Sequence, residues 1–256
     1  MTVDPVLEFS TGFLASAVAV YLLAGLVKGT IGLGLPTAAV SLMAMVGDTR
    51  TAIALAIVPM VLLNGWQIYR SGDVRATWRR FRLLGVTMGI GIGVVSLLAA
   101  RVPTDLITLA LGSAITLFAV SGLLGTVPRL SARFDPLAQV AAGVSAGAIG
   151  GLAGIWAPPI VVYLSSIRLD KDAFVRATGL LLALGSVVLA ISHAATGLLD
   201  ATQATLGLCL VVPALAGFAL GERLRARLDG ATFRRTVLVF FLVMGLNLIR
   251  RGIGLW

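Results

Sequence analysis

Charged residues are scarce in this chain of 256 residues: they make up 12% of it, whereas hydrophobic residues make up 58%. A soluble domain carries about 25% charged residues. Several apolar runs reach the roughly 20 residues that a helix needs to cross the hydrocarbon core of a bilayer. No stretch of the sequence is long and polar enough to form a soluble domain. The composition therefore predicts an all-α polytopic membrane protein whose activity lies within or between its helices.

Cysteine and histidine are nearly absent, and their absence excludes several kinds of site. Cys209 and His193 are the only residues of their types, so the sequence offers no internal disulfide and no cysteine or histidine metal cluster. The motifs of zinc proteases, serine hydrolases and P-loop proteins are also missing. We therefore expect no enzyme, no catalytic residue, no metal site and no cofactor.

Acidic residues are missing from the predicted membrane segments. All 11 of them fall in predicted loops, termini or helix ends. Carriers of protons and cations usually place a carboxylate inside the membrane to bind the ion. The sequence therefore argues against a cation as the substrate, whereas an anion would need cationic or N–H donor groups.

The net charge of +9 comes from basic residues that cluster in short loops between apolar runs. Loop arginines of this kind set the orientation of a membrane protein, so we expect no nucleic-acid partner. The clusters at 70–82 and 223–235 mark two loops as cytoplasmic, and the turn around Asp200 is predicted to be external. The predicted location is the bacterial inner membrane.

Two glycine-rich stretches interrupt the apolar runs, GLVKGTIGLGLP at 25–36 and GVSAGAIGGLAGIWAPP at 143–159. Three glycines recur between them at a constant offset, and each stretch contains a later proline. An aspartate follows twelve residues after that proline in both halves, as Asp48 and Asp170. These matches predict an internal duplication, with one transmembrane repeat at 1–128 and a second at 129–256.

The number of crossings predicts that the two repeats are inverted. The basic loops on both sides of residues 137–167 are predicted to lie on one side, so this stretch makes an even number of passes. Each repeat then consists of a broken or re-entrant helix pair and three full helices, about eight to ten membrane segments in all. Inverted repeats are typical of secondary transporters, whose sites lie near the midplane at interrupted helices. We therefore expect the two breaks to meet across a pseudo-two-fold axis.

The breaks provide the groups that an anion requires. A helix that restarts after a break points free N–H groups and the positive end of its dipole into the gap. Glycine lets an anion approach the backbone closely. The predicted substrate-binding residues are those of the two breaks and polar side chains on nearby helices: Lys28, Gly29, Thr30, Gly32, Gly34, Leu35, Asn64, Gln67, Gly150, Gly151, Gly154, Trp156 and Ser186.

Structural alternatives remain open for these residues. The glycines are also consistent with close helix packing. Lys28 is equally consistent with an interfacial lysine on a turn between two complete crossings. Trp156 fits either the wall of a pocket or an anchor at the membrane surface.

The chain resembles the TauE/SafE family of sulfite and sulfonate exporters, also called the TSUP family. The resemblance rests on GLVKGTIGLGLPTAAVSLMAMVGDTRTAIALAI, on GVSAGAIGGLAGIWAPPIVVYLSSIRLDKDAFVRAT, on the duplication and on the basic loop after Tyr69. It implies a secondary transporter that exports sulfite, sulfoacetate or other sulfonates by alternating access. An anion channel and a non-transporting membrane scaffold or assembly factor are the alternatives. The expected partners are a small anion and the lipid bilayer, and a homo-oligomer remains open.

Overall fold

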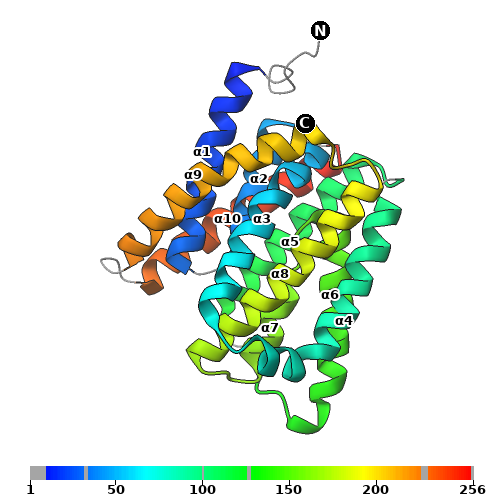
Figure 1. Cartoon of the computed structure of the whole chain (residues 1–256), viewed down its shortest axis with the longest axis vertical. Helices are drawn as coiled ribbons and strands as arrows, with labels where there is room; N and C mark the ends of the chain where they lie inside the picture. The colour runs from blue at the N-terminus through cyan, green and yellow to red at the C-terminus, as the bar shows by residue number, and fades with distance from the viewer. Residues whose placement is uncertain (1–9, 32–33, 100, 126–127, 226–229, 255–256) are drawn as a thin grey trace.

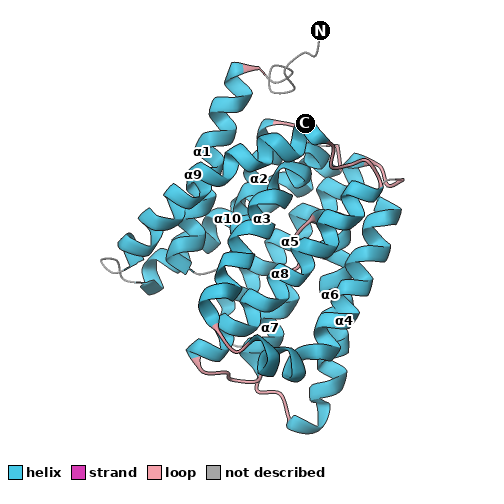
Figure 2. Cartoon of the chain, in the orientation of Figure 1, coloured by secondary structure: helices cyan, strands magenta, loops and turns pink. Residues whose placement is uncertain are grey.

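The structure is a computed structural model that describes residues 10–31, 34–99, 101–125, 128–225 and 230–254. These residues form α-helices and one 3₁₀ turn, with no strand among them (Figures 1 and 2). In this part of the chain the helices are α1 (Thr11–Ile31), α2 (Leu35–Val46), α3 (Thr49–Ser71), α4 (Val74–Ala99), α5 (Thr104–Leu124), α6 (Asp135–Ala153), α7 (Ala157–Ser166), α8 (Lys171–Ala195), α9 (Ala201–Arg225) and α10 (Gly230–Gly252), and the 3₁₀ turn is η2 (Ala132–Phe134).

The helix lengths confirm the predicted all-α polytopic membrane fold. In the described residues, 7 helices are long and apolar enough to cross a membrane. The helices α2 and α7 have 12 and 10 residues, too few for a full crossing. Each short helix follows one of the two glycine-rich stretches, as expected for the second member of a broken pair.

The packing of the helices is the same in both halves of the chain. The helix α1 lies along α9, and α6, which holds the matching position in the second predicted repeat, lies along α4. The pairs α3–α8 and α5–α10 each join a helix to its own counterpart. Figure 1 shows α1, α9 and α10 on one side of the bundle and α4 and α6 on the other, with α3, α5 and α8 between them. This arrangement agrees with a duplication, whereas the inversion of the repeats remains a prediction.

Glycines form the contact surfaces of the α1–α9 and α4–α6 pairs. A Cβ atom on Gly29 would lie 2.2 Å from the carbonyl oxygen of Phe218, and one on Gly147 would lie 2.7 Å from Cα of Gly91. The backbones of the paired helices therefore touch, and only glycine fits at these positions. Close packing thus accounts for several glycines of both glycine-rich stretches.

The aspartates that recur after the two prolines cap matching helices. The Asp48 carboxylate accepts a hydrogen bond from the backbone N–H of Thr51 at 3.0 Å, at the start of α3. The Asp170 carboxylate accepts one from Ala173 at 2.8 Å, at the start of α8. Side-chain caps of this kind satisfy otherwise unpaired N–H groups of a first helical turn.

Candidate functional site

Lys28 is buried in the last turn of α1 and contacts two amide side chains of α3. The residue is only 2% exposed. The ammonium donates hydrogen bonds to Oδ1 of Asn64 at 2.9 Å and to Oε1 of Gln67 at 3.1 Å. Because the two amides are three residues apart, they lie on the same face of α3. The structure thus brings three predicted site residues together and places the Lys28 ammonium away from water.

The Lys28 ammonium has no acidic partner in the described part of the chain. The ion pairs found there are Arg70–Glu222 and Arg80–Asp135. Burying an ion without a counter-ion costs several kcal/mol, of which two amide oxygens recover only a part. An ammonium has three N–H donors, and the two amides use two of them. One charged donor therefore remains for a ligand.

Asn64 supplies a second unused donor beside Lys28. Asn64 is 1% exposed, and its Nδ2 has no hydrogen-bond partner among the described residues. A buried polar group without a partner is rare in native proteins, and a bound ligand or water is a common explanation. The lysine and the amide together thus present N–H groups and one positive charge, which suit an anion.

An exposed ion pair lies one turn beyond this site, at the arginine-rich end of the bundle. Arg70 follows Gln67 by three residues on α3, and its guanidinium lies 3.6 Å from the carboxylate of Glu222 on α9. The backbone N of Glu222 would lie 3.0 Å from a Cβ on Gly29, the residue after Lys28. The Lys28 site is therefore near this end of the bundle.

The first break contains a left-handed glycine. Gly34 has φ 94° and precedes Leu35, the first residue of α2, which is 1% exposed. The hydroxyl of Thr30 donates to the carbonyl oxygen of Leu26 at 2.8 Å, so it is used within α1. Gly32, another predicted site residue, lies outside the described residues.

The second break is built around a buried tryptophan. Gly154 has φ 70° and ends α6, and Trp156 is 1% exposed. The Trp156 indole packs on Gly185 of α8, where a Cβ would lie 2.5 Å from Nε1, and its Cβ lies against Gly150. The burial of Trp156 agrees with a wall of the interior and excludes a surface anchor.

Two other predicted residues near the second break have structural partners. A Cβ atom on Gly151 would lie 2.9 Å from the carbonyl oxygen of Ile92, so this glycine packs on α4. The hydroxyl of Ser186 donates to the carbonyl oxygen of Ala183 at 2.8 Å. The indole Nε1 of Trp156, in contrast, has no partner among the described residues.

The prediction that the two breaks meet at one point is wrong for the described residues. Lys28, near the first break, contacts Asn64, whereas Gly154 of the second break packs on Ile53. These two residues of α3 are 11 apart, or about 17 Å along the helix. The reason is that α1 and α6 have 21 and 19 residues and cross most of a bilayer before they end. Each break thus lies toward a different end of the bundle.

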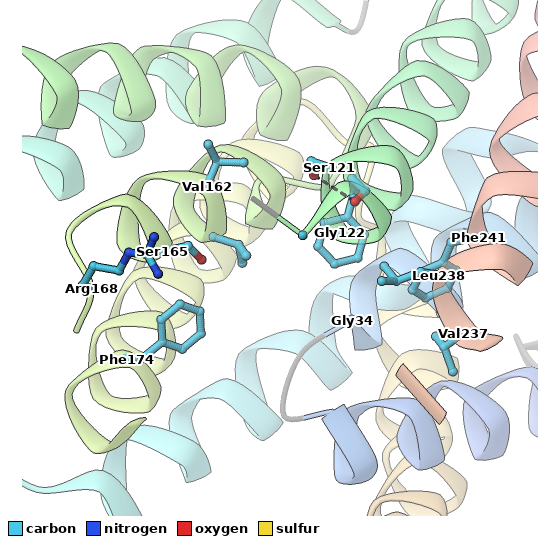
Figure 3. A pocket seen from close by; sticks show the side chains of 13 residues that line it. Gly34, Ser121, Gly122, Val162, Ser165, Arg168, Phe174, Val237, Leu238 and Phe241 are labelled. Atoms are coloured by element: carbon cyan, nitrogen blue, oxygen red, sulfur yellow. Dashed lines mark hydrogen bonds between the residues drawn. The ribbon is translucent and has the colours of Figure 1, made fainter. Parts of the chain in front are cut away.

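A pocket of about 380 Å³ is a feature that sequence reasoning missed. It lies between α5, α7, α10 and the start of α8, with Gly34 at its edge (Figure 3). Three aromatic rings, two hydroxyls and one guanidinium contribute to its lining, those of Phe118, Phe174, Phe241, Ser121, Ser165 and Arg168. Arg168 lies in one of the basic loops that the sequence predicts to set the orientation, and nothing in that pattern indicates that it borders a pocket. The lining thus combines an apolar wall with a few polar groups, as is common in small-molecule pockets.

The comparison with protein families agrees with this architecture. The family model described as "Sulfite exporter TauE/SafE" matches residues 17–248. Neither the curated proteins nor the solved structures contain a match. The matched range covers α2 to α9 completely and most of α1 and α10. The chain therefore belongs to the TauE/SafE family of sulfite exporters, which are membrane transporters.

Proposed function

We propose that this chain is a secondary transporter that exports small sulfur-containing anions, sulfite or organic sulfonates, across the bacterial inner membrane by alternating access. The observation that carries the proposal is the buried Lys28 ammonium, which has amide partners but no carboxylate partner among the described residues. A fixed carboxylate would occupy the charge permanently, whereas amide partners leave it for an exchangeable anion. Membership of a sulfite exporter family supports the chemical class of that anion.

In this proposal the anion contacts the free N–H of Lys28 and Nδ2 of Asn64. Gln67 holds the ammonium through Oε1 and is itself tied to α8, because its Nε2 donates to the carbonyl oxygen of Val175 at 3.4 Å. The site is therefore coupled to the relative position of α1, α3 and α8. Motion of these helices would change the affinity for the anion, as a carrier requires.

The remaining predicted residues belong to the two breaks and have a different proposed role. Gly34 and Gly154 allow a change of direction at opposite ends of the bundle. We assign Thr30 and Leu35 to a gate near the first break, and Gly150, Gly151, Trp156 and Ser186 to a gate near the second. Breaks at opposite ends fit alternate opening to the two sides better than one shared binding point.

Counterflow of labelled sulfite into proteoliposomes tests this function. Wild-type protein should give saturable counterflow, and Lys28→Met should remove it. Arg79→Met is the matched control, because it removes an exposed positive charge from the same end of the bundle and should leave counterflow unchanged. A steady single-channel current would favour a channel, and folded wild-type protein without counterflow would favour a scaffold.

A further inference from the structure

We propose that the Lys28 site selects its ligand by charge and binds singly charged anions, such as hydrogen sulfite and monosulfonates, more tightly than doubly charged ones. This inference rests on the proposed function, since it concerns the substrate of the same site. Its basis is the number and the placement of the charges around Lys28.

Lys28 is the one cation that is buried among the side chains the structure describes. The donors beside it are neutral, namely Nδ2 of Asn64 and the amide of Gln67, which is tied to Val175. A single negative charge on the ligand therefore neutralises the site completely. A second negative charge would be buried with no cation to offset it, which is strongly unfavourable in a medium of low dielectric constant.

The charged side chains that the structure describes on the surrounding helices do not change this balance. The helix α2 has no charged residue, and Lys28 is the charged residue of α1. Arg70 of α3 is paired with Glu222 of α9, and both are about half exposed, so the pair adds no net charge. Arg223 of α9 is exposed, and Arg176 of α8 is half-buried next to Val175. Water screens charges at such positions more than it screens Lys28.

The site also offers two donors to one oxyanion head. The free N–H of Lys28 and Nδ2 of Asn64 belong to two residues that a 2.9 Å hydrogen bond joins. A sulfonate or hydrogen sulfite head has three oxygens at one end, so it can accept from both donors at once. The oxyanion head of such a ligand thus matches the two donors, and its single negative charge matches the single positive charge of Lys28.

Binding of methanesulfonate and sulfate to the purified full-length protein, measured by isothermal titration calorimetry at neutral pH, tests the inference. The two ions are nearly equal in size and differ by one charge, because a methyl group replaces one oxygen. We expect methanesulfonate to bind at least about tenfold more tightly than sulfate. Propanesulfonate and 1,2-ethanedisulfonate form a second matched pair and should show the same order.

Two variants assign the preference to the site. Gln67→Lys adds a second cation next to Lys28 and should shift the ratio of the two affinities toward sulfate. Arg176→Gln removes a cation outside the site and should leave the ratio unchanged.

The outcomes separate this inference from the proposed function. Equal or tighter binding of sulfate, together with loss of all binding in Lys28→Met, would overturn charge selection and leave the anion carrier standing. An unchanged ratio in Gln67→Lys would also overturn charge selection. Failure of every anion to bind the wild-type protein would overturn both proposals.

Discussion

Lys28 is stabilised by amides rather than by carboxylates, and this choice of partner decides what the residue can do. The amide oxygens of Asn64 and Gln67 orient the ammonium without neutralising it. A buried charge in this state gains free energy from any small anion that reaches it. Removing the charge should therefore cost little stability, because an apolar residue of similar volume is often neutral or favourable at such a site.

Sequence reasoning identified the residues of this cluster but not their contacts. Lys28 is the one lysine set within the apolar stretches, and the spacing of Asn64 and Gln67 places them on one helical face. That the lysine reaches α3 depends on the packing of α1, α2, α3 and α9, which no local pattern encodes. The depth of Lys28 in the membrane was open for the same reason.

Asn64→Leu should weaken binding of methanesulfonate roughly 10- to 100-fold. The substitution keeps the branched shape of the side chain but removes both the acceptor of the Lys28 N–H and the free Nδ2 donor, and a hydrogen bond to a charged group contributes about 1.5–3 kcal/mol. Isothermal titration calorimetry measures the change. Thr178→Val is the control, because this buried hydroxyl bonds to its own helix at Phe174; equal affinities in both variants would contradict the role of Asn64.

At the scale of elements, the helices α1 and α6 extend further into the glycine-rich stretches than the positions of the glycines predict. The stretch at 137–167, predicted to be a broken or re-entrant helix pair, forms α6, which continues to Ala153, and the short α7. The glycines of α6 do not end the helix, because they face α4 at backbone contact distance. Apolar composition predicts that such helices exist, whereas the partner of each glycine decides where they end.

Gly217→Val should prevent correct packing of α1 on α9. A Cβ on Gly217 would lie 1.9 Å from the carbonyl oxygen of Leu22, so the two helices must separate. We expect a loss of monodisperse protein in size-exclusion chromatography and a much lower unfolding temperature. Gly65→Ala, where a Cβ meets nothing within 4 Å, is the control. A Gly217→Val protein as stable as this control would contradict the close packing of α1 on α9.

A polar cluster holds α7 against α4 and α6 at the arginine-rich end. Two guanidinium nitrogens of Arg80 bind the Asp135 carboxylate at 2.7 and 3.2 Å. The hydroxyl of Tyr163, on α7, donates to the same carboxylate at 2.8 Å, and Gln139 donates to it at 3.0 Å. The cluster thus fixes the helix that follows the second break.

Tyr163→Phe should lower the free energy of unfolding by about 1.5–3 kcal/mol. The variant loses one hydrogen bond to a carboxylate but keeps the ring that meets Phe81 edge to face. Denaturant or thermal unfolding in detergent measures the loss. Tyr69→Phe, at a residue 80% exposed, should leave stability unchanged, and a similar effect of both substitutions would exclude the cluster as its cause.

At the scale of the whole molecule, composition alone is sufficient for the fold class. The long apolar runs and the rarity of charge predict a helical membrane protein, and the structure confirms it. The matched glycines and the Asp48 and Asp170 caps agree with the predicted duplication. The separation of the two breaks was not predictable, since it depends on how far α1 and α6 extend before each break.

Single-cysteine labelling tests the predicted orientation. In a Cys209→Ser background, Asp200→Cys should react with a membrane-impermeant maleimide in intact cells, because its turn lacks basic residues. Ser131→Cys, between Arg129 and Arg133, should react only after the cells are lysed. The reverse pattern would contradict the predicted orientation of the arginine-rich end.

The central claim is that the Lys28 charge is free for a ligand, and Asn64→Asp tests it most directly. The substitution puts a carboxylate where Oδ1 of Asn64 now lies, 2.9 Å from the ammonium, so the two side chains form a permanent buried ion pair. Isothermal titration calorimetry of methanesulfonate should show no measurable binding to this variant, while its unfolding temperature stays at or above that of the wild type. Wild-type affinity in a folded Asn64→Asp protein would contradict the claim that Lys28 binds the transported anion.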